Sequence, residues 1–150
     1  MKTVLYLAFI IGVLWSTFAL VMLIGYSLVS YASPFLNDIL NVAVKSSRWF
    51  LAFALSFLAS GLCTCLYSLA KASGDNHVIF LSFAFSSSAL SIAIQIYRMV
   101  ASGIGWFAED LLGSYGEIGL VKLVSVGLLA LSLIFFSFQF SLIRMERYSP

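Results

Sequence analysis

Residues 4–29 read VLYLAFIIGVLWSTFALVMLIGYSLV, a run without a single charged side chain. A helix that crosses a membrane needs about 20 mostly apolar residues, because the hydrocarbon core is about 30 Å thick. The run is long for one crossing and too short for two, so it predicts one tilted or slightly overlong span. Lys2 before it and SYA at residues 30–32 after it resemble a signal peptide with a cleavage site. The apolar run is about twice as long as a signal core, so we expect a retained span.

The whole chain has the composition of this first run. It has 150 residues, of which 62% are hydrophobic and 9% charged, and its mean hydropathy is +1.07. Soluble domains carry about 25% charged residues. We therefore expect an all-α integral membrane protein with a single membrane domain over residues 1–150. A net charge of +2 without a basic run argues against nucleic acid as a partner.

Three further apolar runs predict three further spans, at residues 49–70, 78–97 and 120–143. The short polar segment 71–77 contains a glycine and predicts a tight antiparallel hairpin between the second and third spans. In segment 34–48 polar residues recur every three or four positions, which indicates an amphipathic helix. Such a helix lies flat in the membrane interface or packs over the ends of the spans. Segment 99–117 is a second connector, rich in glycine and partly amphipathic.

A short motif occurs in both connectors. Residues 35–40 read FLNDIL and residues 107–112 read FAEDLL. Similar matches in the spans, at nearly constant separation, favour two pseudo-repeated units of span, amphipathic connector and span. Both connectors then lie on one side of the membrane, where they can form a cap that binds a partner. The candidate interface residues of this cap are Phe35, Asp38, Phe107, Glu109 and Asp110.

The Lys and Arg residues do not decide the orientation of these spans, because the two sides of the membrane carry four each. The side with the chain ends has Lys2, Lys71, Arg144 and Arg147, and the connector side has Lys45, Arg48, Arg98 and Lys122. Four of the six acidic residues lie on the connector side, although acids contribute little to orientation. We expect both termini in the cytoplasm, and the plasma membrane of a bacterial or archaeal cell as the location.

Small residues predict how the spans pack, because helices in lipid associate where their backbones can approach closely. The expected packing residues are Ala8, Gly12 and Ser16 in the first span, Ser56 and Ser60 in the second, and Ser82 and Ser86 in the third. The fourth span is rich in phenylalanine, as is typical of a helix that faces lipid or a partner. It also contains Gln139, whose amide needs a hydrogen-bond partner, and a neighbouring subunit is one candidate.

The sequence predicts no catalytic, cofactor or metal site. If the fourth span starts at Leu123, after Lys122, no span contains a charged residue, which argues against a proton-driven rotor or carrier. Cys63 and Cys65 lie two residues apart on one helix and point about 200° away from each other, so they cannot form a disulfide there. His77 is the single histidine. It is too few for a zinc or bis-histidine haem site, and we expect it to be solvated in the hairpin loop.

These observations favour a non-catalytic subunit of a larger membrane assembly of the secretion, conjugation or energy-converting type. Its expected partners are the lipid bilayer and other membrane subunits or further copies of the same chain. An alternative is a pore-forming, holin-like or small transport protein. Its polar path would be lined by serines of the third span, Ser82, Ser86, Ser87, Ser88 and Ser91. A second alternative is a membrane enzyme for lipid or thiol chemistry.

Overall fold

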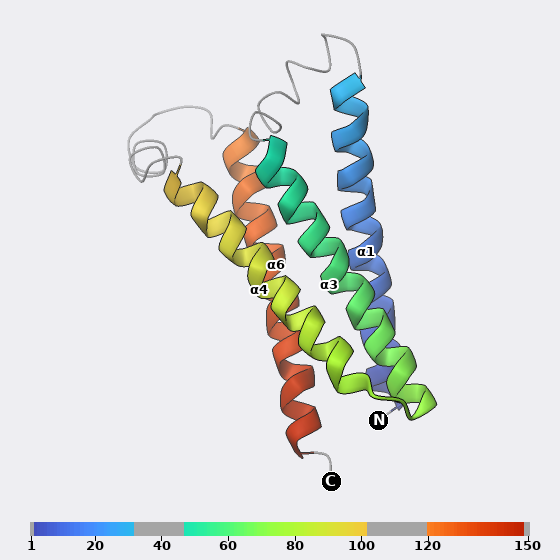
Figure 1. Ribbon diagram of the computed structural model, residues 1–150. Helices are drawn as coiled ribbons and strands as arrows, with labels where there is room; N and C mark the ends of the chain where they lie inside the picture. The colour runs from blue at the N-terminus through green and yellow to red at the C-terminus, as the bar shows by residue number, and fades with distance from the viewer. Residues whose placement is uncertain (1, 32–46, 102–119, 149–150) are drawn as a thin grey trace.

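The computed structural model describes residues 2–31, 47–101 and 120–148, which form four helices (Figure 1). The helices are α1 (Lys2–Tyr31), α3 (Ser47–Ser73), α4 (His77–Ala101) and α6 (Leu120–Tyr148). Each contains a stretch of at least 21 residues that is long and apolar enough to cross a membrane. The prediction of an all-helical chain with four helices of this kind is confirmed.

The connector residues Phe35, Asp38, Phe107, Glu109 and Asp110 lie outside the described ranges. The predicted cap therefore stays a prediction. The pseudo-repeat stays one as well, because its motif lies in the same two segments.

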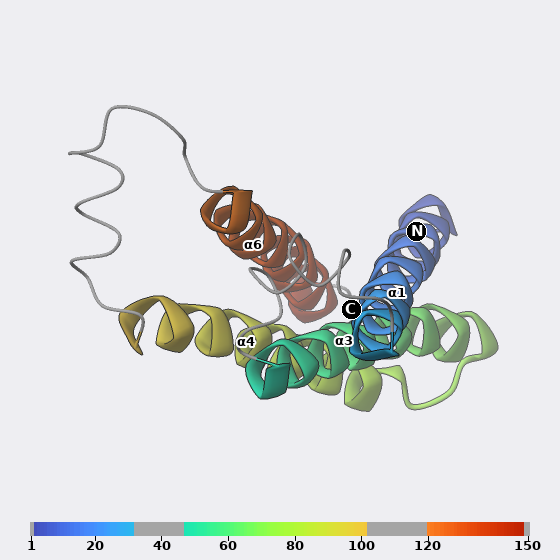
Figure 2. The same ribbon diagram turned by 90° about the horizontal axis from the view of Figure 1, so that it is seen from above.

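Consecutive helices run in opposite directions, so the start of α1 and the end of α6 lie beside the turn between α3 and α4 (Figure 1). Seen from above, α3 and α4 form one layer, and α1 and α6 lie on the same side of it (Figure 2). Trp15 of α1 links the outer helices, because its indole stacks on Phe57 of α3 and on Phe135 of α6. The ring centroids are 4.8 and 4.4 Å apart.

The turn between α3 and α4 is as tight as the sequence predicts. Gly74 has a φ of 81°, which only glycine adopts without strain. The amide of Asp75 donates to the carbonyl of Ala70 at 2.9 Å, and the amide of Gly74 donates to that of Lys71 at 3.4 Å. This pair of bonds is a Schellman motif, which ends α3 and satisfies two carbonyls of its last turn. The turn brings His77 into the first position of α4 rather than into a loop.

Helices α1 and α3 pack backbone against backbone at two glycines. A Cβ atom placed on Gly12 would lie 2.7 Å from Sγ of Cys65 and 3.0 Å from the carbonyl oxygen of Gly61. One placed on Gly61 would lie 2.6 Å from Oγ of Ser16 and 3.1 Å from the carbonyl oxygen of Gly12. Ala8, Gly12 and Ser16 are all buried, which agrees with the stripe expected for the first span. Gly61 was not among the expected packing residues.

Helix α4 turns a different face to α3 than its small residues predicted. Ser60 of α3 is fully buried and Ser56 is half-buried, but Ser82 and Ser86 of α4 are exposed. The buried positions of α4 are Leu81, Ala84, Ser88, Ser91 and Gln95. Serines lie on several faces of α4, so a stripe of small residues does not fix its rotation. Hydrogen bonding between Ser60 and Ser88 selects the face.

The phenylalanines of α6 do not all face outwards, as was expected of this helix. Phe135 is buried against Trp15, and Phe136 stacks on Phe85 of α4 with ring centroids 4.5 Å apart. Phe140, by contrast, is 55% exposed. An aromatic-rich helix can thus contribute both to the core and to the surface, because successive positions point in different directions.

Candidate functional site

The centre of the bundle contains a hydrogen-bonded group of polar side chains from α3, α4 and α6. Gln139 of α6 is completely buried. Its amide nitrogen donates to Oγ of Ser60 at 2.8 Å and to Oγ1 of Thr64 at 3.0 Å. A neighbouring subunit was one candidate partner for this amide, but its nitrogen has both of its partners within the chain. Both partners lie on α3 of the same chain. Ser60 was expected only to pack closely against another helix, and Thr64 was not among the expected packing residues.

Ser60 uses its entire hydrogen-bonding capacity in this group. Its hydroxyl donates to the carbonyl of Ala84 at 3.0 Å, so Ser88, at 2.9 Å, must donate to it. Together with the bond from Gln139, the oxygen then accepts two hydrogen bonds and donates one, which is all that a hydroxyl can do. Thr64 donates to the carbonyl of Ser60 at 2.8 Å. These bonds connect three helices at one residue.

Two buried amide oxygens are left over. Oε1 of Gln139 and Oε1 of Gln95 have no hydrogen-bond partner among the described residues, and Gln95 is 1% exposed. A buried polar atom without a partner costs about 1–3 kcal/mol. Both oxygens are therefore acceptors that a water molecule or another donor would stabilise.

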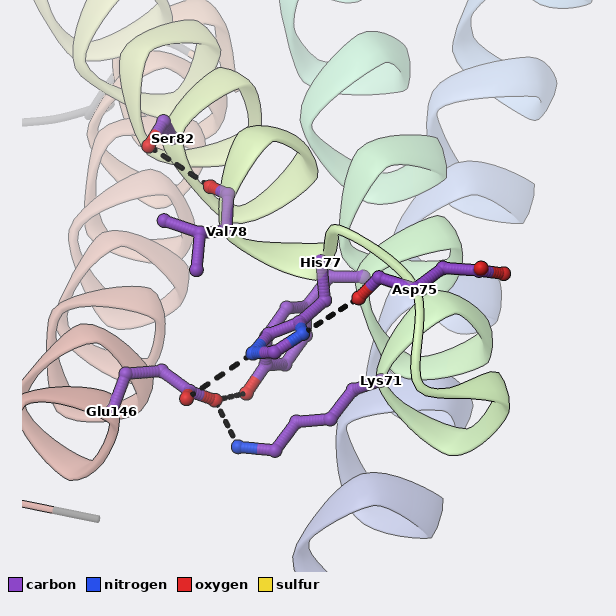
Figure 3. A network of polar contacts seen from close by, with 7 residues as sticks. Lys71, Asp75, His77, Val78, Ser82 and Glu146 are labelled. Atoms are coloured by element: carbon purple, nitrogen blue, oxygen red, sulfur yellow. Dashed lines mark hydrogen bonds and ion pairs between the residues drawn. The ribbon is translucent and has the colours of Figure 1, made fainter. Parts of the chain in front are cut away.

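A second polar group lies where the hairpin turn meets the end of α6 (Figure 3). Glu146 of α6 forms an ion pair with Lys71 of α3 and accepts a hydrogen bond from the hydroxyl of Tyr67 at 2.5 Å. Its other oxygen lies 3.4 Å from Nε2 of His77. Nδ1 of the same histidine lies 3.0 Å from the carbonyl oxygen of Asp75. One carboxylate thus connects the end of α3, the turn and the start of α4 to α6.

This second group was not predicted from the sequence, and the prediction of a solvated His77 is wrong. The side chain of His77 is only 25% exposed. The predicted spans stopped before Lys71 and at residue 143, whereas α3 and α6 continue to Ser73 and Tyr148. The predicted topology did contain a signal, because it placed Lys71 and the charged end of the fourth span on one side.

The second group is centred on one carboxylate, that of Glu146. Its carboxylate is shared by an ammonium, a phenol and an imidazole, so its charge is compensated within the group. A cavity of about 100 Å³ adjoins it between α1, α3 and α6, which is room for a few water molecules. Elsewhere in the described helices, Cys63 and Cys65 are both free thiols.

Comparisons with known proteins give no relative: no family model matches the chain, and neither the curated proteins nor the solved structures contain a similar one.

Proposed function

We propose that the chain is an integral membrane protein that serves as a non-catalytic subunit of a larger membrane assembly. The secretion, conjugation and energy-converting complexes are the classes that this composition suits, and a bacterial or archaeal plasma membrane is the proposed location. The proposal is carried by one feature of the surface, the exposed face of α4.

Small residues form a continuous stripe on the exposed face of α4. The stripe, which we call the α4 small face, consists of Ser82, Ser86, Ala89 and Ala93, all exposed and spaced by three or four residues. Larger exposed side chains flank it, among them Phe83, Leu90 and Ile96. Short side chains thus lie between bulky ones along this face, and we infer a shallow furrow there.

Such a furrow suits another helix better than it suits lipid. Helices in a bilayer associate by van der Waals packing, and small residues let two backbones approach closely. The exposed face of α1 has the opposite character, with Tyr6, Ile10, Leu14 and Val21 projecting outwards. Within the described chain, the small residues of α1 and α3 are already used against each other at Gly12 and Gly61. Those of the α4 small face are all exposed in the described part of the chain, which supports a contact with another subunit.

The interior supports a structural rather than a chemical role. The hydroxyls of Ser60, Thr64 and Ser88 and the amide nitrogen of Gln139 are consumed in bonds between or within helices. Hydrogen bonds between helices in a membrane are each worth about 0.6–2 kcal/mol. The group therefore stabilises a defined bundle that can present the α4 small face rigidly.

The test replaces small residues of the furrow with leucine in S86L/A89L. The matched control is A130L/S137L, which makes the same two changes at exposed positions of α6, where the large exposed Ile134 interrupts the small residues. Membranes are solubilised in mild detergent, and the size and composition of the assembly are measured by native electrophoresis and mass spectrometry after crosslinking. We expect S86L/A89L to dissociate the assembly and the control to leave it intact.

Two results would contradict the proposal. One is a wild-type chain that runs as a monomer and recovers no partner after crosslinking. The other is an assembly that S86L/A89L and A130L/S137L leave equally intact.

A pore built from several copies is the second candidate. The five serines of α4 do not form one path, because Ser88 and Ser91 are buried within the chain. Ser82 and Ser86 are exposed, so in a ring of copies they are the residues that would line a channel. Flux from liposomes at increasing protein density separates the two candidates. Leakage abolished by S86L/A89L would favour the pore, and no leakage at any density would exclude it.

A further inference from the structure

The last two turns of α6 carry a groove that neither polar group of the interior includes. It has a volume of about 300 Å³ and is lined by Phe140, Ile143, Arg144 and Arg147. Positions three, four and seven residues apart lie on one face of a helix, so the two guanidinium groups and the apolar side chains are neighbours. Phe140 and both arginines are exposed.

The arginines of this groove differ from the lysine at the same end of the bundle. Lys71 is paired with Glu146, so its charge is compensated. Within the described ranges neither Arg144 nor Arg147 forms an ion pair. Among the described residues, the groove therefore has two unpaired guanidinium groups at one end and an exposed aromatic ring at the other.

We propose that this groove binds an anionic phospholipid, with its phosphate on Arg144 and Arg147 and its acyl chain along Phe140 and Ile143. Guanidinium groups bind phosphate oxygens through paired hydrogen bonds. The apolar stretch of α6 ends at Arg147, which is where a long cationic side chain reaches the headgroup layer of a membrane. Phe140 lies two turns deeper, at the depth of the acyl chains. Basic grooves at membrane helices recognise lipid headgroups in this manner.

The inference rests on the proposed membrane location but not on the proposed assembly. The partner is a lipid rather than free phosphate, because free phosphate would use the arginines and leave Phe140 and Ile143 without a contact. Variants of the groove should consequently leave the size of the assembly unchanged. Lipid binding thus tests the groove, and the size of the assembly tests the α4 small face, so either proposal can fail without the other.

The experiment adds phosphatidylglycerol, phosphatidylcholine or inorganic phosphate to the full-length protein in detergent and measures binding by native mass spectrometry. We expect phosphatidylglycerol to bind more tightly than phosphatidylcholine, and inorganic phosphate to compete poorly. R144Q/R147Q should weaken phosphatidylglycerol about 30-fold, which at 1.4 kcal/mol per tenfold corresponds to about 2 kcal/mol for two cations. R144K/R147K should retain part of the preference, because it keeps the charges but not the paired hydrogen bonds.

A pair of alanine substitutions tests the apolar part of the groove. F140A should weaken phosphatidylglycerol and phosphatidylcholine alike. I134A, on the same helix but outside the groove and similarly exposed, should weaken neither. Equal affinity of the wild-type protein for the two lipids would overturn the proposal, as would unchanged phosphatidylglycerol binding in a folded R144Q/R147Q. If inorganic phosphate competed strongly and F140A left lipid binding unchanged, the ligand of the groove would be a free anion rather than a lipid.

Discussion

Helices α1 and α6 lie on the same side of the α3–α4 layer but are attached to it by opposite means. α1 is held where side chains are missing, because Gly12 and Gly61 let the two backbones touch. α6 is held where a long side chain is present, because Gln139 reaches across to Ser60 and Thr64. The α1 contact should therefore be sensitive to the size of a side chain, and the α6 contact to its polarity. Three substitutions separate the two cases.

The largest effect is expected for G61A. The added methyl group would lie 2.6 Å from Oγ of Ser16 and 2.9 Å from its backbone nitrogen, so α1 must move. Overpacking of this kind costs about 1–3 kcal/mol, and we expect a value near the upper end because part of the clash is with backbone. The control is G127A in α6, where a Cβ would meet nothing within 4 Å. There the gain in helix propensity should stabilise by up to about 1 kcal/mol. Denaturation in mixed detergent micelles measures the stability of both variants. If G61A were as stable as G127A, the close contact between α1 and α3 would be refuted.

A smaller loss is expected for S60A. The substitution removes the hydroxyl that joins α3, α4 and α6, and leaves the amide of Gln139 with Thr64 alone. We expect a loss of about 1–2 kcal/mol. S56A is the matched control, because within the described helices the hydroxyl of Ser56 bonds to the carbonyl of Ala52 in its own helix, at 2.8 Å. It should cost less than about 0.5 kcal/mol. The same denaturation assay applies, and equal losses in S60A and S56A would show that the hydroxyl does not join the helices.

The smallest effect is expected for E146Q. The amide keeps an acceptor for Tyr67 but loses the charge that pairs with Lys71. The two side chains are 13% and 17% exposed, so partial solvent screening limits the loss to about 1 kcal/mol. D75N, at an exposed acid in the adjacent turn, should have no measurable effect. Hydrogen exchange of the backbone amides at the end of α6 should increase in E146Q but not in D75N. Equal exchange in both variants would show that the ion pair does not hold the end of α6.

The sequence was sufficient for features that depend on length and on local backbone chemistry. The uncharged run at residues 4–29 is long enough for one helix and no more, and Gly74 in a short polar segment predicts the hairpin. The face of α1 was also predictable, because its small residues Ala8, Gly12 and Ser16 form one stripe among bulky neighbours.

Features that depend on rotation and pairing were not predictable. The serines of α4 surround much of the helix, and only the bond to Ser60 shows that Ser88 rather than Ser86 faces inwards. The partners of Gln139 were left open, with a neighbouring subunit as one candidate, because no sequence pattern indicated that Ser60 and Thr64 would lie opposite it. The group at Glu146 was missed because hydropathy ends a span at the first charge, whereas a helix continues while its charges find partners.

The saturation of Ser60 has a consequence for the register of α6. Once α3 and α4 have formed their hairpin, Oγ of Ser60 has donated its proton to Ala84 and accepted that of Ser88. A single lone pair then remains open on this side of the layer. α6 fills it with Gln139 in the observed register, and a slip by one helical turn would lose the bond to Ser60. Single buried polar residues set the register of coiled coils in the same way. The hairpin thus offers one open acceptor at Ser60, which favours the observed register of the last helix.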